Sequence, residues 1–167
     1  MQFTIKQALD NIAAGRDREA VARVLRHIGS RLSTQMLSSA GLVIKAGGGV
    51  LAKSGATDAY ALVGGALVKL TADTDMPALT GLSISANKFN VACFLMDAGG
   101  TRSVLFGREG GSIASLKWPD LPPDQVLIGA LLITHNAAFT GGTTALDTAT
   151  TVYLSPIGAV DPTVLYS

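Results

Sequence analysis

Few side chains in this sequence could perform covalent chemistry, and they lie far apart along the chain. Nucleophilic catalysis needs a base within hydrogen-bonding distance of a serine or a cysteine. The chain has one cysteine, Cys93, and two histidines, His27 and His135, and no serine lies in a GxSxG motif. The apolar neighbours of Cys93 favour a buried thiol over a nucleophile. The sequence therefore predicts a protein that is not an enzyme, and the alternative is a small hydrolase that uses Cys93 or a serine together with His135.

Sequence motifs for metal or phosphate binding are also missing. The two histidines lie more than a hundred residues apart, with no HExxH or CxxC motif beside them. Two carboxylate pairs, Asp73 with Asp75 and Asp120 with Asp124, lack the glycine and the downstream glutamate of a calcium loop. The glycines at 47–49 do not stand in the GxxxxGK(S/T) order of a nucleotide-binding loop. We therefore expect turn residues at these positions, and neither a cofactor nor a metal.

Arginines form the densest charged cluster of the chain. Five of the seven arginines lie within sixteen residues, namely Arg16, Arg18, Arg23, Arg26 and Arg31. A basic cluster can bind nucleic acid, but no aromatic side chain stands among these arginines to stack on bases, and Asp17 and Glu19 reduce the charge. The cluster therefore favours a solvated or protein-docking helix over a nucleic-acid site.

The composition indicates a folded chain with covered surface. The 167 residues are 48% hydrophobic and 15% charged, with a formal net charge of +1, whereas a typical soluble domain has about 25% charged residues. This low charge excludes charge-driven disorder and indicates that neighbours in an assembly cover part of the surface, because interface centres are depleted in charge. The longest apolar run, over 126–133, is too short for a membrane helix, which needs about 20 residues. The first ten residues lack the apolar run of a secretory signal, so we expect neither a membrane span nor secretion.

The chain changes character near residue 40. Residues 1–40 carry six basic and three acidic side chains, and residues 41–167 carry seven basic and nine acidic ones. Spacings of three and four predict a helix whose apolar residues are Ala20, Val21, Val24, Leu25, Ile28 and Leu32, with Asp17 as its N-cap. A shorter helix is expected over 5–14, and the serine-rich stretch over 29–41 is interpreted as a frayed helix end or a linker. We therefore divide the chain into a helical, arginine-rich arm (1–40) and a β-rich body (41–167).

Short apolar runs separated by glycine, proline and aspartate predict strands in the body. The glycines at 64 and 65, between runs over 60–63 and 66–70, are typical of a tight hairpin, and a second hairpin is expected over 88–106. Further strands are predicted over 112–118, 126–134 and 150–154, and the run over 126–134 is apolar enough to be a central strand buried on both faces. About eight strands without helical crossovers predict a mainly β fold, an antiparallel β-sandwich or a jelly-roll or barrel-like body with an N-terminal α-helical arm.

Parts of the body resemble small virion structural proteins of tailed bacteriophages. The resemblance lies in Tyr60–Leu70 (YALVGGALVKL), Asp75–Gly81 (DMPALTG), Leu121–Gly129 (LPPDQVLIG), Leu131–Thr134 (LLIT) and Phe139–Asp147 (FTGGTTALD). These are turn-and-strand patterns that carry no catalytic chemistry, and the arginine-rich arm is not part of them.

The resemblance implies a capsid decoration, or cement, protein, which would be a homo-oligomer, either a trimer or a dimer, on the outer surface of the virion. The implied partner is the major capsid protein, bound across subunit boundaries, so that the chain stabilises the assembled lattice. Such a protein is made in the cytoplasm of the host bacterium. The alternative in the same class is a tail, baseplate or head-fibre component.

The arm is the predicted docking element. A helix attached to a body that closes its own core needs a neighbour to bury its apolar stripe. Arginines beside the stripe would meet carboxylates on the capsid or on a sister subunit, and such contacts weaken with salt. The predicted partner-binding residues are Arg16, Val21, Arg23, Val24, Leu25, Arg26 and Ile28.

Overall fold

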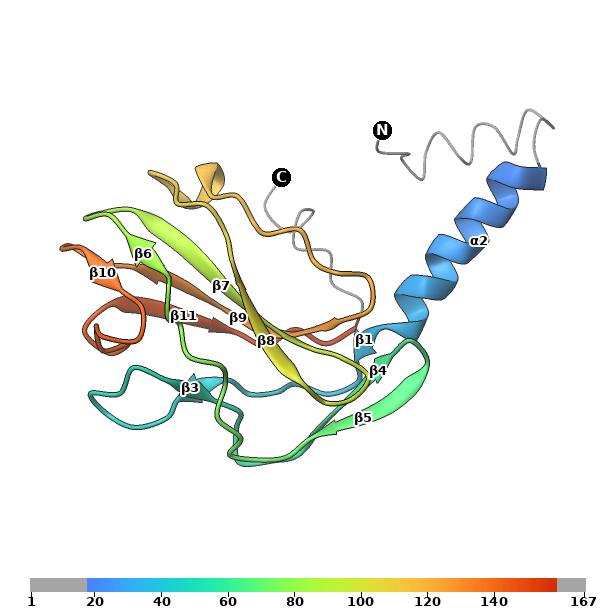
Figure 1. The fold of residues 1–167 in the computed structure, drawn as a ribbon, viewed down its shortest axis with the longest axis horizontal. Coiled ribbons are helices and arrows are strands. Elements are labelled where there is room, and N and C mark those ends of the chain that lie inside the picture. The colour runs from blue at the N-terminus through green and yellow to red at the C-terminus, as the bar shows by residue number, and fades with distance from the viewer. Residues whose placement is uncertain (1–17, 159–167) are drawn as a thin grey trace.

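The computed structural model describes residues 18–158, and within them the fold is mainly β with antiparallel sheets (Figure 1). Arg16, Asp17 and the helix expected over 5–14 lie outside these residues. In chain order the elements are α2 (Arg18–Ser33), β1 (Gln35–Met36), β2 (Val43–Ile44), β3 (Ala52–Lys53), β4 (Ala59–Val63), β5 (Ala66–Leu70), β6 (Ser83–Ile84), β7 (Phe89–Met96), β8 (Arg102–Phe106), the 3-10 helix η1 (Ile113–Ser115), β9 (Val126–Thr134), β10 (Phe139–Thr140) and β11 (Thr150–Leu154).

A four-stranded sheet with the order β11-β9-β7-β8, here called the central sheet, organises the body. β9 pairs with β7 along its whole length and with β11 on its other side. All residues of β9 except Thr134 are buried, as are all residues of β7 except Phe89. The predicted central strand over 126–134 is therefore confirmed.

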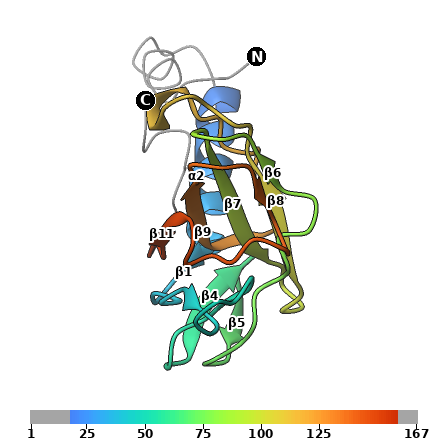
Figure 2. The same ribbon diagram turned by 90° about the vertical axis from the view of Figure 1, so that its left-hand side faces the viewer.

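Different parts of the chain cover the two faces of the central sheet. On one face, Phe94, Ile128 and Ile133 pack into a large apolar cluster with residues of a three-stranded sheet, β1-β4-β5, and of two-stranded sheets, β2-β3 and β6-β10. On the other face, Val91 and Cys93 belong to a second cluster, which Leu116, Trp118 and Leu121 cover. In the end-on view of Figure 2, β4 and β5 lie below the strands of the central sheet.

Both predicted hairpins are confirmed. β4 and β5 pair from Ala59↔Leu70 to Val63↔Ala66, and the two glycines between them have φ of +59° and +84°, which favours glycine at both positions. β7 and β8 pair across a loop in which the Asp97 carboxylate accepts hydrogen bonds from the backbone N–H groups of Gly99 and Thr101, both at 2.9 Å.

The strand predicted over 112–118 is wrong. The serines at 112 and 115 bond reciprocally through side chain and backbone and cap the 3-10 helix η1, and only the isolated bridge Arg108↔Lys117 pairs this segment. Serine hydroxyls that bond the local backbone offer an alternative to a strand ladder.

The interpretation of 29–41 as a frayed helix end or linker is also wrong. α2 runs to Ser33, and β1 follows after one residue and pairs with β4. Met36 and Ala40 are buried in the large apolar cluster. Residues 35–40 therefore pack with the β-rich body, although their sequence shows no strand period.

Gly129 lies in the middle of β9, where other segments approach the sheet closely. An added Cβ would collide with the carbonyl oxygen of Leu154 and lie 2.5 Å from Cδ1 of Leu42. We predict that Gly129→Ala lowers the free energy of unfolding by about 1–3 kcal/mol, because the strands must separate to admit the methyl group. Urea denaturation measures this.

Gly47→Ala is the matched control, because nothing lies within 4 Å of a Cβ at that turn position. Its effect should stay within about 0.5 kcal/mol. Equal stability of the two variants would contradict the close approach at Gly129.

Candidate functional site

The structure separates Cys93 from His135, the cysteine pair of the hydrolase alternative. Cys93 pairs with Ala130, whereas His135 follows Thr134 at the end of β9. Five residues of strand separate the two positions by about 16 Å, far beyond hydrogen-bonding reach. The His135 Nδ1 atom instead lies 3.1 Å from the Ala137 carbonyl oxygen. Burial raises the pKa of the Cys93 thiol to about 12, so its environment disfavours the thiolate that a nucleophile needs.

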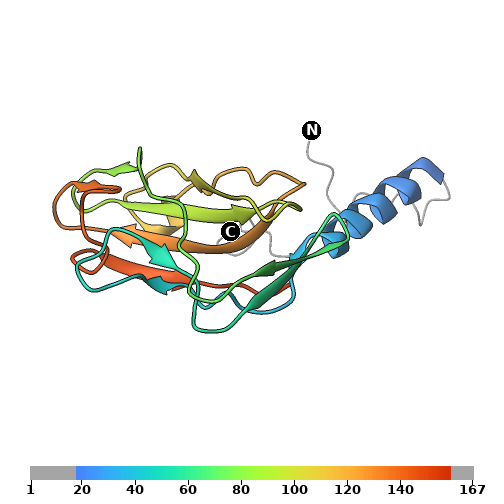
Figure 3. The same cartoon turned by 60° about the horizontal axis from the view of Figure 1, so that its bottom comes forward.

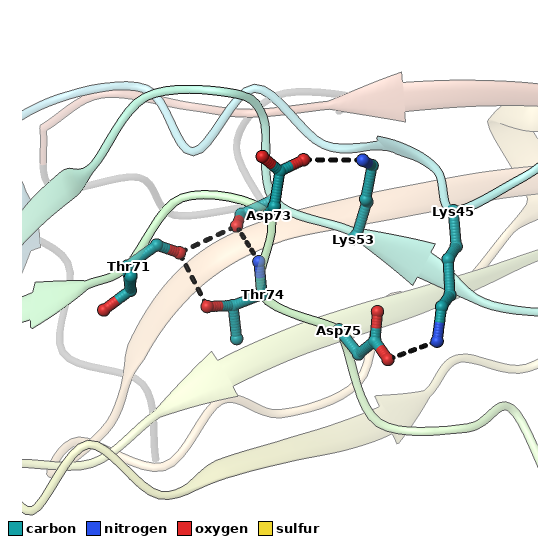
Figure 4. A network of polar contacts seen from close by, with 7 residues as sticks. Lys45, Lys53, Thr71, Asp73, Thr74 and Asp75 are labelled. Atoms are coloured by element: carbon teal, nitrogen blue, oxygen red, sulfur yellow. Dashed lines mark hydrogen bonds and ion pairs between the residues drawn. The ribbon is translucent and has the colours of Figure 1, made fainter.

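The carboxylates at 73 and 75 face lysines. Asp73 bonds the Lys53 ammonium and Asp75 bonds the Lys45 ammonium, each at 2.5 Å (Figure 4). Asp73 has a φ of +52°, typical of a turn, and Asp120 and Asp124 are exposed in a loop. In the part of the chain that the structure describes, no group of three histidine, cysteine or acidic residues could hold a metal ion.

A buried hydroxyl lies beside these ion pairs. The Ser54 side chain is fully buried, donates to the Thr71 carbonyl oxygen at 3.0 Å and accepts from the Thr74 N–H at 2.8 Å. Thr74 also donates its hydroxyl to the Thr71 carbonyl oxygen (Figure 4). The polar network therefore fastens the 71–75 loop to β3, which is a structural task.

Exposed apolar side chains are the feature that points to a function. Among the described side chains, ten large hydrophobic ones are exposed, and seven of these belong to α2, to the outward side of the three-stranded sheet or to the segment that extends this sheet: Leu25, Ile28, Leu32, Leu37, Tyr60, Leu67 and Ile157.

The outer face of the three-stranded sheet follows from its register. Ala59, Ala61 and Val63 point into the core, so the alternate residues point outward. Across the strands, Leu62 pairs with Leu67 and Tyr60 with Lys69. The antiparallel bridge Met36↔Gly158 places Ile157 opposite Leu37, which lies beside Tyr60. We call Leu37, Tyr60, Leu62, Leu67 and Ile157 the outer face.

Helix α2 projects from the end of the body at which the β4–β5 turn lies (Figures 1 and 3). The last carbonyl groups of a helix have no partner within it. Here the Ser33 carbonyl accepts from the Gly65 N–H at 2.8 Å, and the Leu32 carbonyl accepts from the Gln35 side chain at 3.0 Å. Gly64 donates its N–H to the Thr34 hydroxyl. The hairpin turn therefore fixes the base of the helix.

The predicted partner-binding residues are described to different extents. Leu25 and Ile28 are 62% and 43% exposed, Arg26 is exposed and Val21 is half-buried. Arg23 and Val24 lie within α2, but their side chains and all of Arg16 are outside what the structure describes. With Leu32, which is 59% exposed, Val21, Leu25 and Ile28 form what we call the apolar stripe of α2.

The charges beside the outer face are paired within the chain. The Lys69 ammonium lies 2.6 Å from the Asp58 carboxylate. The hydrogen bond from Lys69, together with one from the Ala72 N–H, lowers the pKa of Asp58, and the same ion pair raises the pKa of Lys69. Both groups therefore stay charged at neutral pH, and the outer face needs no charged partner.

Sequence reasoning missed the outer face. Tyr60 and Leu67 stand in runs whose neighbours are also apolar, so no polar alternation marks the exposed side. The Gly-Gly turn was the available signal, because it fixes the pairing of the two strands and hence which side chains share a face.

No protein-family model matches the chain, and searches of curated proteins and solved structures also gave no match. Among the described helices, none is long and apolar enough to cross a membrane.

We predict that Cys93 is inert in the folded protein. Its raised pKa leaves roughly a thousandfold less thiolate than an unfolded chain has at pH 8, and its side chain is buried. Labelling with a thiol-reactive disulfide at pH 8 should therefore be slow in buffer and rapid in denaturant. Because the folded-state pKa is the higher one, the folded state should lose stability as pH rises from 9 towards 12. Rapid stoichiometric labelling of the native protein would contradict this.

We also predict that the 71–75 loop depends on Ser54 more than on the ion pairs. Ser54→Ala leaves the Thr74 N–H without its partner and should cost about 1–3 kcal/mol of unfolding free energy. Asp73→Asn keeps the turn conformation and removes an exposed ion pair, so it should cost less than about 1 kcal/mol. Thermal denaturation of the two variants checks this order, and a larger loss in Asp73→Asn would refute it.

Proposed function

We propose that this chain is a non-enzymatic virion structural protein that decorates and stabilises a phage capsid by binding the major capsid protein across subunit boundaries. The observation that carries the proposal is the gathering of seven exposed large hydrophobic side chains at one end of a body whose own core is closed. Contiguous exposed apolar surface marks a protein contact. A protein that binds only the assembled lattice stabilises that lattice by mass action.

The stretches that resemble phage virion proteins lie in the framework of the body. Tyr60–Leu70 forms the β4–β5 hairpin, and Leu121–Gly129 leads into β9. Phe139–Asp147 begins with β10, and it then holds the 45–50 loop through bonds from the Leu146 N–H to the Gly49 carbonyl oxygen and from the Gly48 N–H to the Asp147 carboxylate. We infer that the resemblance concerns a β-sandwich-like scaffold.

A head-fibre, tail or baseplate component is the second candidate. The helix that projects from one end of the β body favours it (Figure 3), because such a helix can connect a body to a distant attachment point. The two candidates differ in stoichiometry. A decoration protein is present in proportion to the major capsid protein, whereas a tail or fibre component is present in few copies.

The test uses empty capsids assembled from the major capsid protein of the phage that encodes this chain. We predict that the purified chain co-sediments with them at a fixed ratio to the capsid protein. Leu25→Asp should abolish co-sedimentation, because a carboxylate in the apolar stripe prevents its burial against protein. Ile113→Asp should bind like the unmodified chain, because Ile113 is exposed elsewhere on the body.

Quantitative mass spectrometry of virions measures the copy number independently. A number close to that of the major capsid protein is the expected result. A few copies per virion would favour the second candidate, and absence from virions would contradict both.

A further inference from the structure

We propose that the apolar stripe of α2 and the outer face of the three-stranded sheet together form an interface between copies of this chain. The occupant is a second copy, placed so that its helix packs along α2 and its three-stranded sheet lies against the outer face. This inference does not rest on the capsid as a partner, because it concerns the chain alone in solution.

The spacing of the stripe fits an identical helix. Val21, Leu25, Ile28 and Leu32 follow one another at intervals of four, three and four residues. This alternation keeps one seam along a helix and is the pattern by which helices pack around each other in coiled coils. Every copy in a symmetric assembly carries the same seam. The α2 helix of a second copy therefore has the apolar spacing needed to pack against the stripe.

The charges of the region permit copies to approach. No charged residue interrupts the stripe between Val21 and Leu32, and the exposed Arg26 lies about 130° around the helix from its centre. On the outer face, the Lys69 ammonium is paired with Asp58 of its own chain. Among the described side chains no charge therefore lies within the stripe, while by register Arg18 takes an a position before it and Arg31 a g position beside it.

Gly29 supports close approach of another helix. It lies next to the stripe inside α2, and nothing is within 4 Å of a Cβ built on it. Its φ is not in the left-handed region, so neither packing within the chain nor backbone conformation requires glycine there. Glycine inside a helix costs stability relative to alanine. A small residue at this place lets a second backbone come near.

The size of the surface indicates that both faces take part. A helix of 16 residues is about 24 Å long and 10 Å wide, which gives roughly 240 Å². The outer face, about four strand spacings by five residues, adds roughly 300 Å². A standard interface takes about 800 Å² from each partner. Neither face approaches this size alone, and the two together give roughly 540 Å², close to the lower end of specific interfaces, about 600 Å² per partner.

The residue types at the seam also indicate the number of copies. The three-residue step from Leu25 to Ile28 makes leucines 25 and 32 the a positions of a heptad, and Val21 and Ile28 the d positions. Leucine at a with isoleucine at d shifts parallel coiled coils towards three or four strands. We therefore expect an assembly of three or four chains.

The test is sedimentation equilibrium of the full chain, without capsids, over a range of protein concentrations. The expected mass is three or four times 17.1 kDa. Ile28→Asp and Leu67→Asp, one on each face, should each weaken association at least tenfold. Ile113→Asp is the matched control, since Ile113 is 41% exposed and Ile28 is 43% exposed, and it should keep the mass of the unmodified chain. Circular dichroism melts show that each variant is folded.

A monomer of 17.1 kDa at high concentration would overturn the proposal, and so would unchanged association in either Ile28→Asp or Leu67→Asp. These outcomes are separable from those for the proposed function. A monomer that co-sediments with capsids would refute self-association alone, and an oligomer that binds no capsid would refute the capsid partner alone.

Discussion

The pairing of two strands that have no polar face constrains most of this structure. β7 and β9 lie side by side, and their side chains are apolar on both sides of the sheet. Asn90 is the buried exception, and its side-chain Oδ1 accepts a hydrogen bond from the Val91 N–H. Burial of apolar side chains is the main favourable term in folding, so both faces of this pair must be covered. The three small sheets cover one face and residues 116–121 cover the other. The short strands are held in place because their inward side chains pack against this core.

Each layer that covers the central sheet buries only the side that faces the sheet. The three-stranded sheet turns Ala59, Ala61 and Val63 inward, and no layer formed by residues 18–158 covers its second face. The turn at its tip donates the Gly65 N–H to the Ser33 carbonyl oxygen and so holds the end of α2. Two apolar surfaces that the described residues leave exposed therefore lie at the same end of the molecule, because the β4–β5 hairpin carries one of them and anchors the helix that carries the other. The position of the candidate surface is thus a consequence of how the core is closed.

The sequence predicts the elements whose local pattern determines them. The glycines at 64 and 65 specify the β4–β5 hairpin, and the apolar run over 126–134 specifies β9. The two-residue strands are not predictable in this way, because each is defined by a distant partner, as in the pairing of Phe139 with Ile84. The same limit explains the misread segment over 29–41, where Met36 is buried through pairing with Ala61. The apolar stripe of α2 is visible in sequence, whereas the outer face depends on register and on the bridge to Gly158.

Self-association at the helix end would leave other surfaces for the capsid. The loops at the opposite end of the body connect β2 with β3, β6 with β7, and β10 with β11 (Figure 1), and they carry small and polar residues such as Gly48, Asn87 and Thr143. Contacts made by such residues are individually weak, since they bury little apolar area. An assembly of several chains presents several copies of these loops at once, and multivalent binding then exceeds the affinity of one loop set by orders of magnitude. On the proposed capsid, oligomerisation through α2 and the outer face would present several loop sets at once and so convert weak loop contacts into stable decoration. In this arrangement a carboxylate at Leu25 would remove capsid binding indirectly, by dispersing the chains, and direct contact of the arm with the capsid would not be needed.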